Sequence, residues 1–176
     1  MIIQAAGAII DGSLRDDLWL EVTDGLITSI TAGKHNGPDL VINGVLIPGF
    51  IDIHCHGGGG YYFSNVNSDL ISIAIETHRQ AGTTTQYASL VTADLDQLKA
   101  QIEALIPFVR SGDLAGIHLE GPYLSHAKCG AHAPELLRAP QLAEVQSLIE
   151  WGQGTIAMVT IAPELEGALE SIAWLA

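Results

Sequence analysis

Basic residues are scarce in this sequence. Seven Lys and Arg stand against 20 Asp and Glu, which gives a formal net charge of −13 over 176 residues. A chain this acidic repels the phosphates of nucleic acids and the headgroups of anionic lipids. We therefore expect neither nucleic acid nor a membrane as a partner. With 48% hydrophobic residues, the composition also argues against intrinsic disorder.

Cysteines and long apolar runs are scarce as well. The two cysteines, Cys55 and Cys129, are too few for a disulfide scaffold and lack the spacing of a zinc knuckle. The apolar start has no basic segment and is interrupted by Asp11, so neither a signal peptide nor a membrane helix of about 20 apolar residues fits it. These absences predict a globular, cytoplasmic chain.

Short strands fill the first 48 residues. Apolar segments on both sides of Asp24-Gly25 predict a tight hairpin, because this dipeptide supplies the positive φ angles of a two-residue turn. Asn43-Gly44 is predicted to repeat the turn, and residues 33–39 are predicted to form a loop. Residues 1–48 thus read as a small all-β domain, a β-sandwich segment.

The pattern changes at Pro48, where apolar strands begin to alternate with helical stretches. This alternation is typical of βα units around a parallel sheet. The predicted strands are 49–56, 83–92, 114–120 and 155–162, and the predicted helices are 68–80, 94–109, 140–152 and 164–175. Asp94 is expected to cap the second helix, and successive apolar residues in the strands predict burial on both faces. Residues 49–176 are therefore predicted to be α/β.

His54-Cys55-His56 ends the first of these strands and precedes four glycines. Residues two apart on a strand point to the same face, so both imidazoles can aim at one point beyond the strand's carboxyl end. Barrel enzymes build their active sites at this edge, and imidazole binds zinc and similar ions. Two hydrogen-bonded histidines that cap the strand explain the pattern equally well.

Glu120 ends the third predicted strand. A carboxylate in such an apolar segment needs a partner that offsets its desolvation, either a cation or an arginine. Because no arginine is near in the sequence, the metal is favoured. His118 either points to the same site or fills the interior, and the filling role is favoured.

The polar stretch 121–139 is long for a connection within a compact domain, and such loops are usually functional. It carries His132, which either donates a hydrogen bond to a substrate carbonyl or lies in solvent. It also carries Cys129, which has no evident neighbouring base. His35 is interpreted as a loop residue and His78 as an exposed helix residue.

Four segments resemble a known family. PGFIDIHCHG at 48–57 resembles the first-strand motif of the amidohydrolase superfamily, metal-dependent hydrolases on a (β/α)8 barrel. HLEGP at 118–122, CGAH at 129–132 and MVTIAPE at 158–164 are similar to the N-acetylglucosamine-6-phosphate deacetylases. A complete barrel needs about 250 residues. The resemblance therefore implies an N-terminal half, with a TIM barrel truncated to about its first four βα units.

The resemblance also implies an activity and a site. The activity is hydrolysis of N-acetylglucosamine 6-phosphate to glucosamine 6-phosphate and acetate in amino-sugar catabolism, by metal-activated water. Glu120 matches the family's metal-binding glutamate, and His54 and His56 match a pair that holds a second ion in some members. Ala131 and His132 match a substrate-contacting pair. The implied cofactor is zinc or iron, as one or two ions.

Other parts of the family's site are expected in the later half of its chains, and a homodimer is implied for the full-length enzyme. Those parts are two further histidine ligands, the general-base aspartate and an arginine that helps to hold the phosphate. Two alternatives stay open: an amidohydrolase that acts on a different amide, or a non-catalytic half-barrel that associates with another chain through its open strand edge.

Overall fold

The computed structural model describes residues 1–176, which divide into two compact units, Met1–Gly49 and Phe50–Ala176. Each unit has its own sheet and its own hydrophobic core. No helix has the length and apolar character needed to cross a bilayer.

The first unit is one four-stranded sheet. Its strands are β1 (Ile2–Ile10), β2 (Ser13–Thr23), β3 (Leu26–Ala32) and β4 (Leu40–Leu46). They lie in the order β3-β2-β1-β4, antiparallel except for the parallel pair β1 and β4. The all-β prediction is confirmed, but the single sheet does not support a sandwich.

The two predicted turns of this unit have different outcomes. Thr23 pairs with Leu26, and Asp24 and Gly25 have φ angles of 52° and 78°, so the hairpin is confirmed. The prediction for Asn43-Gly44 is wrong, because both residues lie inside β4. They lie where the register between β4 and β1 shifts. Glycine is common at such an irregularity, as it is in a tight turn, because it has no side chain.

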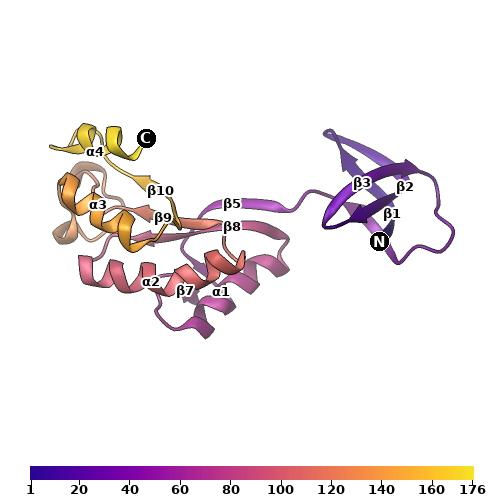
Figure 1. Cartoon of the computed structure of the whole chain (residues 1–176), viewed down its shortest axis with the longest axis horizontal. Helices are drawn as coiled ribbons and strands as arrows, with labels where there is room; N and C mark the ends of the chain where they lie inside the picture. The colour runs from indigo at the N-terminus through magenta and orange to yellow at the C-terminus, as the bar shows by residue number, and fades with distance from the viewer. The chain divides into compact units, whose positions relative to one another are not determined.

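The second unit is α/β (Figure 1). Its main strands are β5 (Phe50–Cys55), β8 (Thr83–Val91), β9 (Gly116–Glu120) and β10 (Ile156–Thr160), all parallel in the order β10-β9-β8-β5. Its helices are α1 (Ser68–Gln80), α2 (Leu95–Ser111), α3 (Leu142–Trp151) and α4 (Ala168–Leu175). The predicted alternation is confirmed. A two-stranded hairpin of β6 (Gly57–Gly58) and β7 (Tyr61–Tyr62) was not predicted.

Local sequence sets the ends of these helices. Asp94 caps α2 as predicted, since its side chain accepts a hydrogen bond from the backbone N–H of Gln97 at 2.8 Å. Gly112, in the left-handed conformation, ends that helix. The last helix begins at Ala168, later than predicted, because Gly167 before it is also left-handed.

The core of the second unit lies on one face of its sheet. Ala88 and Leu90 of β8 and Leu119 of β9 are buried in one cluster with apolar residues of α1 and α2, the two helices that Figure 1 shows on one side of the sheet. Burying a side chain of leucine size stabilises the fold by roughly 1.5–3 kcal/mol. Residues at the alternate positions, such as Ser89, face the opposite way and carry polar groups.

The prediction that all four strands are buried on both faces is wrong. It holds for β9, but most of β5 is exposed, including Ile51 and Ile53. An apolar run reports the hydrophobicity of a strand but not whether helices cover both of its sides. Here the helical core covers one face, and the polar face of the sheet carries the candidate site.

Candidate metal and substrate site

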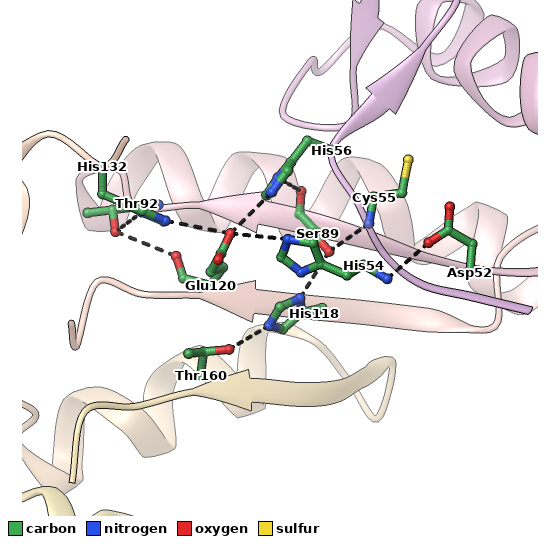
Figure 2. A network of polar contacts seen from close by, with 10 residues as sticks. All are labelled: Asp52, His54, Cys55, His56, Ser89, Thr92, His118, Glu120, His132 and Thr160. Atoms are coloured by element: carbon green, nitrogen blue, oxygen red, sulfur yellow. Dashed lines mark hydrogen bonds and ion pairs between the residues drawn. The ribbon is translucent and has the colours of Figure 1, made fainter. Parts of the chain in front are cut away.

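The parallel register brings polar residues to one edge of the sheet. His56 directly follows β5, Glu120 ends β9, and Thr160 ends β10 in register with Glu120. The carboxyl ends of parallel strands meet at the same edge, so side chains far apart in sequence gather there (Figure 2).

Glu120 is the centre of this group. Its Oε2 lies 3.1 Å from Nε2 of His56, 3.5 Å from Nε2 of His132 and 3.9 Å from Nε2 of His54. The arginine alternative is not borne out, because the arginine salt bridges involve other carboxylates. The structure thus brings three of the predicted site histidines to the predicted carboxylate.

The contact between His56 and Glu120 requires a positive charge. Nδ1 of His56 lies 3.1 Å from the backbone carbonyl oxygen of Ser89. A carbonyl only accepts, so Nδ1 carries a proton, and in the neutral ring Nε2 presents a lone pair. That lone pair faces a carboxylate oxygen, another acceptor. The pair is therefore stable only with a proton on Nε2 or with a cation between the two atoms.

The spacing of these atoms fits a metal ion. Ligand atoms about 2.0–2.2 Å from zinc lie about 3.3–3.6 Å apart when the bond angle is near tetrahedral. One ligand atom each from His54, His56 and Glu120 lies within 4.8 Å of the others. His54 is half-exposed, so an ion could enter from solvent. These three residues fit a divalent cation.

His118 fills the interior. Its ring is 2% exposed, and its two nitrogens lie 2.9 Å from the hydroxyl of Ser89 and 2.8 Å from the hydroxyl of Thr160. Burial lowers the pKa of His118, which keeps the ring neutral. The neutral ring has a single lone pair, and because a hydroxyl contacts each nitrogen, that lone pair is engaged in a hydrogen bond and not directed at Glu120. This agrees with the role that the sequence favoured.

A cleft of about 720 Å³ opens beside Glu120. Its lining includes His56 and, from the long loop, Lys128, Ala131 and His132. Glu120 is the only carboxylate and Lys128 the only lysine or arginine that line it. The volume is in the range of small-molecule sites.

The long loop is fixed at both ends, which holds His132 in the cleft. Tyr123 is fully buried, and its hydroxyl donates a hydrogen bond to Oε1 of Glu144 at 3.0 Å. Arg138, near the other end of the loop, donates to Oε2 of the same carboxylate at 3.2 Å. Burial together with the neighbouring Glu144 charge raises the pKa of Tyr123 far above its ordinary value, so the hydroxyl remains a donor.

Tyr123→Phe tests this anchor. It removes the hydroxyl that satisfies one oxygen of a half-buried carboxylate, so we expect the free energy of unfolding to fall by about 1–2 kcal/mol. Urea denaturation followed by circular dichroism measures the change. Tyr61→Phe, at an exposed tyrosine, is the matched control and should change stability much less. Equal stability of wild-type and Tyr123→Phe proteins would mean that this hydrogen bond does not anchor the loop.

His78 is not the exposed helix residue that the sequence predicted. The ring is partly buried, with Nε2 lying 2.9 Å from the carbonyl oxygen of Gly57 and 3.1 Å from Sγ of Cys55. Asp52, Cys55 and His78 thus form a second group of potential metal ligands. The carbonyl requires a proton on His78 Nε2, so this nitrogen has no lone pair for an ion. The hydrogen bond to the Gly57 carbonyl explains why the polar ring of His78 is partly buried.

Sequence reasoning missed Ser89 and Thr92. Ser89 accepts from the backbone N–H of Cys55 at 3.2 Å, and Thr92 contacts His132 through both its backbone N–H and its hydroxyl. Ser89 lies near the carboxyl end of β8 and Thr92 directly follows it, at the same sheet edge where His56 and Glu120 were predicted. That position was the available signal. Serine and threonine are common in strands, so their residue types gave none.

Comparisons with known proteins show what the whole chain is similar to. No family model matches the chain. The curated N-acetylgalactosamine-6-phosphate deacetylase of Shewanella sp. (strain ANA-3) is 32% identical over 176 residues, which cover 93% of this chain and 44% of that protein. The N-acetylglucosamine-6-phosphate deacetylase of Danio rerio is 37% identical over 142 residues, 74% of this chain and 34% of that protein.

Solved structures give the same result. The crystal structure of N-acetyl-D-glucosamine-6-phosphate deacetylase from Mycobacterium smegmatis is 42% identical, has a TM-score of 0.92, and matches 99% of this chain and 47% of its own. A variant of that enzyme in complex with N-acetyl-D-glucosamine 6-phosphate is similar with a TM-score of 0.91. The chain spans about half the length of the relatives that it matches nearly throughout. It is therefore homologous to part of the N-acetylglucosamine- and N-acetylgalactosamine-6-phosphate deacetylases.

Proposed function

We propose that this chain contributes to deacetylation of N-acetylglucosamine 6-phosphate, yielding glucosamine 6-phosphate and acetate. The observation that carries the proposal is the Glu120 carboxylate, which meets three imidazoles beside a cleft of about 720 Å³. The substrate is supported by the complex of the Mycobacterium smegmatis relative. N-acetylgalactosamine 6-phosphate is a second candidate, because two curated relatives carry that name.

The proposed architecture is the first half of a (β/α)8 barrel. Strands β5, β8, β9 and β10 are adjacent and parallel, as successive strands of such a barrel are. The high similarity to about half of a larger deacetylase structure supports this interpretation. In a closed barrel the polar face with Ser89 and His118 would be the interior, which accounts for polar residues on an otherwise apolar sheet.

The proposed metal ligands in this chain are Glu120, His56 and His54. A divalent ion, zinc or iron, supplies Lewis acidity that polarises the amide carbonyl and makes water acidic enough to attack near pH 7. Glu120 contributes negative charge, and the carbonyl oxygen of Ser89 orients His56 so that its lone pair faces that carboxylate.

His132 is proposed to bind the acetamide group. Its Nε2 lies at the cleft, 3.5 Å from the carboxylate of Glu120, and its ring is almost completely shielded from solvent. An N–H at this place can donate to the carbonyl oxygen as negative charge develops there. Ala131 also lines the cleft, and its small side chain leaves room for the sugar.

The chain by itself is expected to turn over poorly. A general base must take a proton from water and return it to the leaving amine, yet no carboxylate other than Glu120 lines the cleft. Lys128 alone offers a lysine or arginine charge for the phosphate. The remaining groups are proposed to come from residues equivalent to the part of the relatives that this chain does not match.

The test compares two proteins. One is the 176-residue chain, and the other, called the joined enzyme, is this chain fused to the part of the Mycobacterium smegmatis deacetylase that it does not match. We expect acetate release from N-acetylglucosamine 6-phosphate by the joined enzyme only. The galactosamine epimer, assayed in parallel, ranks the two substrates by kcat/KM. A joined enzyme that is folded and metal-loaded but leaves both phosphosugars intact contradicts the proposal.

A further inference from the structure

The hydrogen bonds of Thr92 determine which nitrogen of His132 carries the proton. The backbone N–H of Thr92 points at Nδ1 of His132 at 3.3 Å, and the Thr92 hydroxyl lies 2.8 Å from the same nitrogen. A backbone N–H can only donate, so Nδ1 must present its lone pair. In the neutral ring the proton is therefore on Nε2.

This arrangement makes His132 a donor toward the cleft. Its Nε2 faces Oε2 of Glu120 at 3.5 Å, and an N–H there has no lone pair to offer a metal ion. His56 has the opposite arrangement, because the carbonyl of Ser89 holds the proton on its Nδ1. One strand end thus supplies a carbonyl to one imidazole and an N–H to the other, and both rings meet the same carboxylate.

The position of Thr92 is itself restricted by its surroundings. Thr92 is 7% exposed, and its hydroxyl lies 3.5 Å from the backbone carbonyl oxygen of Glu120. The next residue, Gly121, has a φ angle of 91°, and a Cβ built there would overlap the Thr92 hydroxyl oxygen. The backbone after the proposed metal ligand therefore leaves room for this hydroxyl.

We propose that Thr92 is a positioning residue that locks His132 in its Nε2–H form and aims this N–H into the cleft. Its effect on the tautomer stands on the hydrogen bonds alone. Its effect on turnover rests on the proposed deacetylase function, since the N–H is inferred to meet the acetamide carbonyl. A comparison of the wild-type protein with Thr92→Ser and Thr92→Val separates the effect of the hydroxyl from the effect of the side chain's shape.

The first measurement is nitrogen NMR of the 15N-labelled 176-residue chain at pH 8 with a chelator, using long-range 1H–15N correlations. We expect the His132 ring as the Nε2–H tautomer, with the Nδ1 resonance displaced by its hydrogen bonds. In Thr92→Val, which keeps the branched shape, Nδ1 should move toward the value of an unbonded nitrogen. Thr92→Ser should restore the wild-type spectrum. The backbone amide spectrum verifies that each variant is folded.

The second measurement is turnover of the joined enzyme. Thr92→Val should lower kcat about tenfold, as expected for a weakened hydrogen bond, with KM and bound metal near wild-type values and recovery in Thr92→Ser. A wild-type ring protonated on Nδ1, or an unchanged Nδ1 resonance in Thr92→Val, would overturn the proposal. Absence of deacetylation in the parent joined enzyme would instead count against the proposed function and leave the NMR result standing.

Discussion

Glu120→Gln is expected to remove most of the zinc affinity of the 176-residue chain. The substitution keeps the size of the side chain but deletes the only negative charge among the three proposed ligands. Replacing an outer-shell partner of a metal typically costs 10- to 100-fold in affinity, so losing a ligand should cost at least about 100-fold. Calorimetric titration of the metal-free chain with Zn²⁺ measures the affinity directly.

Thermal unfolding distinguishes loss of the metal from damage to the fold. A metal that binds only the folded chain raises its midpoint by mass action, so zinc should raise the midpoint of the wild-type chain and not that of Glu120→Gln. With chelator present, the two midpoints should be similar, because the amide can donate to the lone pair of His56. Glu150→Gln, at an exposed site on α3, removes the same charge and should behave as wild type. Full zinc affinity in Glu120→Gln would exclude Glu120 as a ligand.

Much of this site could be predicted from strand periodicity and residue chemistry. Two histidines spaced by one residue at a strand end must share a face, and a carboxylate in an apolar strand must have a partner, so His54, His56 and Glu120 could be predicted. The place of His132 could not be derived in that way. It depends on how the loop is anchored by Tyr123, a contact that forms only when α3 packs beside it.

The failed predictions share a physical cause. Asn43-Gly44 suits both a hairpin turn and an irregular strand, and only the pairing with β1 decides between them. The polarity of His78 predicted exposure, but a hydrogen bond to the Gly57 carbonyl offsets the cost of drawing it inward. In both cases the local sequence permits two outcomes, and a contact distant in sequence selects one.

The opposite tautomers of His56 and His132 suit the two rings to different chemical roles. A lone pair directed at a carboxylate suits cation binding, whereas an N–H directed at the same region suits a carbonyl oxygen. Backbone groups at the carboxyl end of β8 make both assignments, at Ser89 within the strand and at Thr92 directly after it. Because backbone groups do not change with pH or rotate independently, the two rings keep distinct chemical roles although both approach Glu120.

His132→Ala in the joined enzyme is expected to lower kcat by about 100- to 1,000-fold, the usual effect of removing one donor to a developing oxyanion. The imidazole is lost from the cleft, but the three proposed metal ligands are intact, so metal content should equal that of the parent. Acetate release under saturating substrate and elemental analysis of the same sample measure the two quantities. An interaction made mainly in the transition state should alter kcat more than KM.

His126→Ala is the matched control, because His126 belongs to the same loop and is exposed. It should leave both turnover and metal content unchanged. Unchanged turnover in His132→Ala would remove His132 from the mechanism, and with it the catalytic consequence assigned to Thr92. Loss of metal together with turnover would instead make His132 a ligand. That result would contradict the Nε2–H tautomer, because a ring whose Nδ1 accepts from the Thr92 N–H has no second lone pair for an ion.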